Sequence, residues 1–86
     1  MRYKEFKEEV EKLGLKIIDR WGCFYIVTTG GITEWLIASV STESPCAINT
    51  DHYGPMIKEE TFRQLFHILV KFAQTSIEER HYEEVD

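Results

Sequence analysis

The stretch that decides the fold is FRQLFHILVKFA, residues 62–73. Wound as a helix at about 100° per residue, it gathers its apolar side chains on one side and its polar side chains on the other. The apolar side holds Phe62, Leu65, Phe66, Ile68, Leu69, Val70, Phe72 and Ala73. The polar side holds Arg63, Gln64, His67, Lys71 and Gln74. Because so wide an apolar side needs more than one neighbour, we expect the rest of the chain to be arranged around it.

This central helix is expected to run over 58–74. Glu59 and Glu60 favour its start, because carboxylates in the first turn interact well with the helix dipole. After it, a hydroxyl residue is followed three positions later by Glu at 75–78 and again at 76–79, which is the spacing of a capping box. We therefore predict a short last helix.

A narrower apolar stripe lies at the start of the chain, over 3–13. Its members are spaced by three, four and three positions, as one side of a helix requires, and they are Tyr3, Phe6, Val10 and Leu13. Gly14 follows at the position where a left-handed C′ residue suits glycine. The pattern predicts a helix that ends there and buries one side.

Between the two helices the period changes, and β-branched and aromatic residues become frequent. The expected strands are 16–19, 23–28 and 33–40, with a short fourth strand at 46–50. The expected turns are 20–22, the glycine-containing stretch 29–32 and the stretch 51–55 before the central helix. The chain is therefore predicted to be α+β: an N-terminal helix, an antiparallel three- to four-stranded β-meander, a long amphipathic helix and a short C-terminal helix. Its 86 residues suit a single domain, 1–86, in which 77–86 form an acidic terminal helix or tail.

The strands carry apolar residues on both of their faces. Alternation places Phe24 and Ile26 opposite Tyr25 and Val27, and it places Trp35 and Ile37 opposite Leu36, Ala38 and Val40. Two helices cover only one face of such a sheet. We expect the other face to be covered by the segment 42–57, by a second copy of the chain in a homo-oligomer, or by a protein partner.

The charge of the chain limits the kinds of partner that it can bind. The formal net charge of −5 argues against direct nucleic-acid binding, which requires a dense positive surface. Residues 77–86 alone contribute −4 of it. The apolar runs are too short to span a bilayer, so we expect no membrane segment. The charged opening MRYKE is unlike a signal peptide, and together with two well-separated cysteines it favours a cytoplasmic location.

The reactive residue types show no spacing typical of a catalytic or metal site. The soft metal ligands His52, His67, His81, Cys23 and Cys46 lack the short spacing of structural zinc sites, so no metal or cofactor is expected. Cys46, Asp51 and His52 are the right types for a nucleophile with its base. A small Cys/His-dependent enzyme is therefore kept as an alternative to a non-enzymatic protein.

Both ends of the chain resemble small uncharacterised proteins encoded by phages and prophages of Gram-positive bacteria. The resemblance rests on EFK at 5–7, EKLGL at 11–15 and LVKFAQTSIEER at 69–80, with Ser76 where that string often has Pro. It implies an origin in a phage or prophage and a bacterial host. It carries no catalytic motif.

The residues expected to bind a partner are aromatic or acidic. The aromatic candidates are Trp35, Trp21, Tyr25 and Tyr53, because Trp and Tyr dominate interface energetics. The acidic candidates are Glu78, Glu79, Glu83 and Glu84. We expect a phage-type accessory protein that acts by protein–protein interaction. The alternative within this class is an acidic inhibitor whose carboxylates occupy the phosphate site of a host nucleic-acid-processing or defence enzyme.

Overall fold

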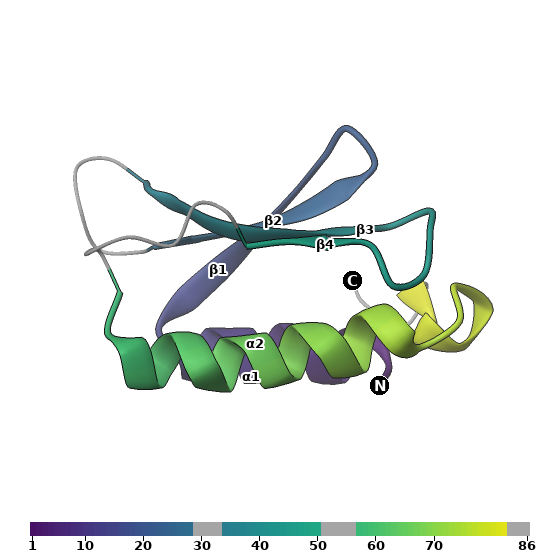
Figure 1. Cartoon of the computed structure of the whole chain (residues 1–86). Coiled ribbons are helices and arrows are strands. Elements are labelled where there is room, and N and C mark those ends of the chain that lie inside the picture. Colours follow the sequence, from purple (N-terminus) through teal and green to yellow (C-terminus); the bar gives the residue numbers. More distant parts are fainter. Residues whose placement is uncertain (29–33, 51–56, 83–86) are drawn as a thin grey trace.

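A computed structural model describes residues 1–28, 34–50 and 57–82 of the chain. Its elements are α1 (Tyr3–Lys12), β1 (Leu15–Arg20), β2 (Cys23–Thr28), β3 (Leu36–Ser41), β4 (Ile48–Asn49), α2 (Glu59–Gln74) and the 3₁₀ turn η1 (Glu78–Arg80). The strands form one antiparallel sheet in the order β1-β2-β3-β4. Both α-helices lie against the same face of this sheet (Figure 1). The α+β class and the short fourth strand are therefore confirmed.

Two predicted turns, 29–32 and 51–55, lie outside the described residues. Within the described ranges, none of the helices combines the length and the apolar character that crossing a membrane requires.

The covered face of the sheet meets the helices through a compact aromatic core. The Phe6 ring of α1 stacks on Phe72 of α2 with 4.1 Å between centroids, and Tyr3 stacks on Phe24 of β2 at 4.5 Å. The remaining core members are aliphatic: Val10, Leu15, Ile26, Ile37, Ala38, Val40, Leu65, Leu69 and Ala73. These side chains join α1, α2 and the sheet into one hydrophobic cluster, which is the main source of the fold's stability.

The apolar side of α2 is narrower than predicted. Leu65, Leu69, Phe72 and Ala73 are buried, but Phe66 is 42% exposed. Placing Phe66 on the packed side was wrong, because α1 and the sheet meet only the central stripe of the helix. The flanking residues Phe62, Ile68 and Val70 are half-buried. The polar side agrees with the prediction, since Arg63, Gln64, His67, Lys71 and Gln74 are all exposed.

The pairing of β2 with β3 contains an irregularity that moves one residue to the other face. Ile26 pairs with Ala38 and Val27 pairs with Leu36, so Ile37 is the extra residue of a β-bulge. Ile37 and Ala38 are consequently both buried in the core. The prediction that Ile37 faces away from Ala38 was wrong, because strict alternation does not hold through a bulge.

The C-terminal segment is fixed to the body of the protein by Arg80. This arginine is fully buried, and its guanidinium carbon lies 4.5 Å from the centroid of the Phe72 ring. It donates hydrogen bonds to Ser41 O (2.7 Å), Tyr82 Oη (2.9 Å), Thr75 O (3.1 Å) and Ala73 O (3.2 Å). Two of these carbonyls belong to the end of α2, where the helix dipole favours a cation. The guanidinium thus ties α2, the end of β3 and the turn η1 together.

Candidate functional site

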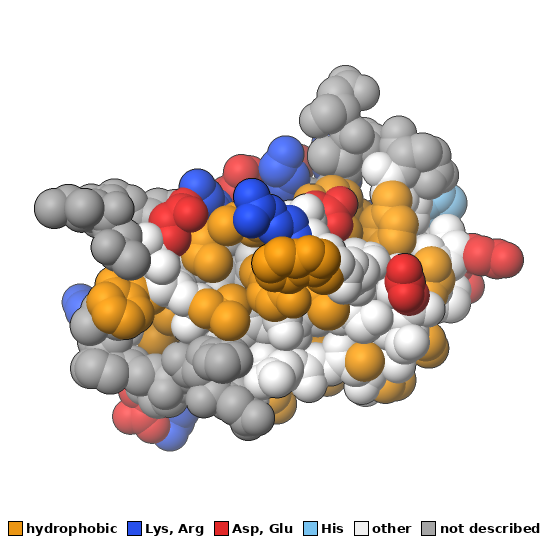
Figure 2. Space-filling view, turned by 90° about the horizontal axis from the view of Figure 1, so that it is seen from above, with side chains coloured by type: hydrophobic (Ala, Val, Ile, Leu, Met, Phe, Trp, Pro, Cys, Tyr) orange, Lys and Arg blue, Asp and Glu red, His pale blue; other side chains and the backbone are white. Residues whose placement is uncertain are grey.

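The face of the sheet that points away from the helices is called the open face below. Strand alternation and the cross-strand pairs Lys16–Val27, Ile18–Tyr25 and Arg20–Cys23 show which side chains lie on this face. The outward positions are Lys16, Ile18, Arg20, Cys23, Tyr25, Val27, Leu36, Ser39, Ser41 and Asn49. Seen from this side, hydrophobic side chains gather near the middle of the face, with charged side chains of both signs around them (Figure 2).

The described part of the connection between β3 and α2 does not lie across this face. Its turn is tied to the helix side of the molecule, because the N–H of Cys46 donates to Ala73 O of α2 at 2.7 Å. The following residues, Ile48 and Asn49, pair with β3 and so widen the sheet instead of covering it. The segment 42–57 was one of the three covers expected for this face, beside a second copy and a protein partner. Residues 42–50 do not lie across it, while 51–56 lie outside the described residues.

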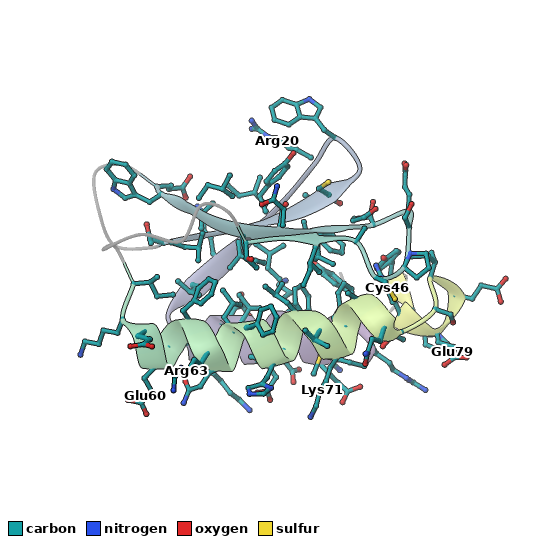
Figure 3. The ribbon with its side chains drawn as sticks, viewed as in Figure 1. Arg20, Cys46, Glu60, Arg63, Lys71 and Glu79 are labelled. Carbon is teal, nitrogen blue, oxygen red and sulfur yellow. The ribbon has the colours of Figure 1, made fainter. Side chains whose placement is uncertain are left out.

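Three side chains at one end of the open face form what we call the Trp21 cluster: Arg20, Trp21 and Tyr25. The Trp21 ring meets Tyr25 edge to face, with centroids 6.1 Å apart, and the Arg20 guanidinium lies 6.0 Å from the Trp21 ring centroid. Trp21 is 84% exposed, more than any other large hydrophobic residue described. Arg20 lies beside the turn on the side away from the helices (Figure 3). The cluster is therefore available to a ligand.

The backbone explains how Trp21 reaches this position. Trp21 and Gly22 are the two loop residues between β1 and β2, and both have positive φ, +52° and +72°. A two-residue loop with two positive φ values has the character of a type I′ turn, which matches the twist of the strands. Such positions favour Asn, Asp and Gly, whereas a bulky side chain is strained there. The turn thus presents an indole where folding prefers a small polar residue.

A shallow hollow of about 430 Å³ adjoins the cluster through Tyr25. Its lining comes from three places: Cys23 and Tyr25 of β2, Leu36, Ser39 and Ser41 of β3, and Ile48 and Asn49 of β4 with the preceding Ala47. The walls combine hydroxyl and amide groups with apolar side chains, as ligand sites do. Val27 is 5% exposed, although its cross-strand neighbours are the exposed Lys16 and the half-buried Leu36. The accessible part of the face therefore includes the cluster and the hollow.

Trp35, the first aromatic candidate, is placed elsewhere. It immediately precedes β3, although the strand was expected over 33–40, and it hydrogen-bonds with Thr28 at the end of β2. Trp21 adjoins the beginning of β2, at the opposite end of that strand. Trp35 is 51% exposed, and the neighbouring Glu34 forms a salt bridge with Lys16. The structure therefore unites Trp21 with Tyr25 and leaves Trp35 apart.

The acidic candidates divide between described and undescribed residues. Glu78 and Glu79 are exposed in η1, whereas Glu83 and Glu84 lie outside the described residues. The aromatic candidate Tyr53 also lies outside them. Glu79 borders a second hollow of about 630 Å³ at the end of α2. The lining also contains Lys71 and Glu5, so its charge is mixed and it does not resemble a string of phosphates.

The reactive residue types are dispersed over the described chain. Cys23 is half-buried and Cys46 is exposed, and both are free thiols. His67 is exposed on the polar side of α2, as expected, while Asp51 and His52 lie outside the described residues. Within 1–28, 34–50 and 57–82, no three His, Cys, Asp or Glu side chains come together in a way that could hold a metal ion.

Two arginines matter here that residue-type reasoning did not single out. Arg20 could have been found from the two-residue turn, because that turn sets the register in which Arg20 shares the open face with Tyr25. Arg80 was counted as a charge of the acidic tail, but it is buried. The spacing that predicted a short last helix gave no sign that this arginine would be buried.

Comparison of the chain with models of protein families, with curated proteins and with solved structures finds no match.

Proposed function

We propose that the chain is a non-enzymatic accessory protein of phage or prophage origin that works in the bacterial cytoplasm by binding another protein through the open face of its sheet. The observation that carries the proposal is Trp21, which is 84% exposed on a turn with positive φ. Its only neighbours among the described aromatic and cationic contacts are Tyr25 and Arg20. An indole in this position contributes little to folding and much to an interface.

The composition of the cluster supports a protein as the partner. Trp, Tyr and Arg are the residue types most often found as hot spots, and truncating one of them commonly weakens a complex by about 2 kcal/mol or more. A partner on this face would cover few charges, because only Lys16 and Arg20 among its outward strand positions are charged. Depletion of charge around aromatic anchors is typical of the centre of an interface.

The experiment is quantitative affinity capture from a bacterial host lysate with the intact protein and single variants. Trp21→Ala and Tyr25→Ala are expected to lose a protein that the wild type retains. The matched control is Phe66→Ala, which removes an exposed aromatic ring from α2, on the helix side of the sheet. Binding of the purified partner is then measured by calorimetry.

The proposal fails if the captured proteins are the same for wild type, Trp21→Ala and Tyr25→Ala. It also fails if Phe66→Ala loses the partner as fully as the two variants of the open face do.

A further inference from the structure

We infer that the open face binds a short acidic segment of its partner protein, with a carboxylate held by Arg20 and an apolar side chain held by Trp21 and Tyr25. This inference rests on the proposed function and names the chemistry of the bound segment.

The first observation is that Arg20 has no ionic partner among the described residues. The other outward-facing cation of β1, Lys16, forms a salt bridge with Glu34. The only contact of the Arg20 guanidinium given by the described structure is with the Trp21 ring, at 6.0 Å. A guanidinium presents a planar fork of donors that matches a carboxylate with two hydrogen bonds. Arg20 is thus the charged group left for a ligand.

The second observation is the distribution of charge over the molecule. The chain carries −5 overall, yet the outward strand positions hold two cations, Lys16 and Arg20, and no acid. On the other side of the sheet, α1 and α2 both carry Lys or Arg as well as Glu, so their charge is mixed. A carboxylate near Arg20 therefore finds a local positive charge on the open face. Complementarity of this kind sets the association rate and the choice of partner.

The third observation is the cost of placing Trp21 in its turn. A non-glycine residue at positive φ is strained, and such strain is found where a binding surface holds it in place. The indole stands beside Arg20 and against Tyr25, so one ligand can pair with the guanidinium and cover both rings. The carboxylate and the apolar side chain must then be close neighbours in the bound segment.

The hollow beside the cluster suits a short segment as the occupant of the face. The adjoining hollow, about 430 Å³, has room for one or two side chains of an extended peptide.

Single-stranded nucleic acid is also anionic and stacks on aromatic rings. Its affinity, however, comes from many phosphate contacts, each made by a cation. The open face offers a single cation without an ionic partner among the described residues. A peptide carboxylate needs only that one, so the observations favour the acidic segment.

The test is selection of short random peptides on the intact protein, followed by fluorescence anisotropy with the synthesised winners. We expect winners with Asp or Glu next to an apolar residue. Arg20→Glu and Trp21→Ala are each expected to weaken their binding at least about tenfold. Trp21→Asn repeats the second loss with a residue that suits the turn. The matched control, Arg63→Glu on the far side of α2, is expected to change binding by less than about twofold.

Selection on the Arg20→Glu protein sharpens the test, because reversal of the charge should select peptides rich in Lys or Arg. Winners without acids that need Trp21 but ignore Arg20→Glu overturn the acidic segment and leave the protein-binding face standing. Winners indifferent to Trp21→Ala and Tyr25→Ala overturn both proposals.

Three other results also overturn the inference. The first is the absence of any peptide enriched above an unrelated control protein. The second is binding of an oligothymidylate probe that Arg20→Glu abolishes while no acidic peptide is selected. The third is self-association in sedimentation that Trp21→Ala abolishes, because it assigns the face to a second copy.

Discussion

On the helix side of the sheet Phe24 is 3% exposed, whereas on the opposite side Trp21, three residues earlier in the chain, is 84% exposed. Phe24 lies among the rings of Tyr3, Phe6 and Phe72. Among the described rings, Trp21 meets only that of Tyr25, edge to face. The hairpin thus sends its large aromatic residues to two environments. One set stabilises the fold, and the other set is left for a partner.

The covered side and the open face of the sheet differ in how deeply their residues are buried, and not in how polar those residues are. The covered side includes Arg80, a full charge, because four hydrogen-bond acceptors surround it. The open face includes Trp21, one of the most apolar side chains, exposed to water. A charged residue is thus buried and an apolar residue is exposed, the reverse of what the residue types suggest. The buried Arg80 is informative about the structure, and the exposed Trp21 is informative about function.

The largest expected effect is on the covered side, where Leu69→Ala should lower the free energy of unfolding by about 2 to 5 kcal/mol. Leu69 is fully buried in the hydrophobic cluster, so its removal leaves a cavity. Urea unfolding measures the change. The matched variant in the same helix is Phe66→Ala, which removes a larger but partly exposed side chain and should cost less than about 1 kcal/mol. Equal losses would contradict the assignment of the buried stripe.

The next effect tests whether the charge on the covered side stabilises the fold. Arg80→Met keeps a long side chain but removes the donors to Ser41 O, Ala73 O and Thr75 O, and it should cost about 1 to 3 kcal/mol. Arg63→Met is its control, because Arg63 forms only an exposed ion pair with Glu59 and should change stability by less than about 0.5 kcal/mol. If the two variants unfold at the same urea concentration, the Arg80 contacts are not stabilising.

On the open face we expect a gain in stability. Trp21→Asn replaces a strained indole by a residue suited to a type I′ turn and should raise the free energy of unfolding by about 0.5 to 1 kcal/mol. The melting temperature of the variant, measured by circular dichroism, should rise by a few degrees while peptide binding is lost. A loss of more than about 1 kcal/mol would mean that the indole serves the fold, which would remove the contrast between the two faces.

Local patterns were sufficient to predict much of this architecture. The helices and strands follow from the spacing of apolar residues, and Gly14 takes the positive φ, +79°, that its place after α1 suggested. Three features depended on contacts between distant segments and could not be predicted. The bulge at Ile37 arises from pairing between β2 and β3, the exposure of Phe66 depends on how far α1 extends over α2, and Arg80 is buried by the end of β3.

The candidate site was predictable to a similar extent. Residue type was enough to choose Trp21 and Tyr25, but their contact depends on the register of the hairpin. Trp35 has the same chemistry, and only the position of the third strand separates it from the cluster. That Arg20 pairs with none of the described acids depends on where each of those acids lies. A sequence pattern does not contain that information.

The smallest expected effect concerns Tyr3, which is half-buried at the rim of the covered side and stacks on Phe24. Burial raises the pKa of its phenol above the usual value, and the negative charges of Asp19 and Glu11 add to the increase. The unfolded chain ionises this phenol near pH 10, before the folded protein does. The folded state then holds a proton that the unfolded state has released, so the free energy of unfolding falls as the pH rises from about 10 through the raised pKa.

Tyr3→Phe tests this effect because phenylalanine keeps the ring and has no proton to release. Below about pH 9 the variant and the wild type should have similar stability, since the phenol is neutral in both states there. Above about pH 10 the wild type should lose stability more steeply in urea unfolding, while the other tyrosines contribute equally to both proteins. Parallel pH profiles would show that the phenol of Tyr3 is as well solvated when folded as when unfolded. Tyr3 would then be more exposed to water than its stacking on Phe24 indicates.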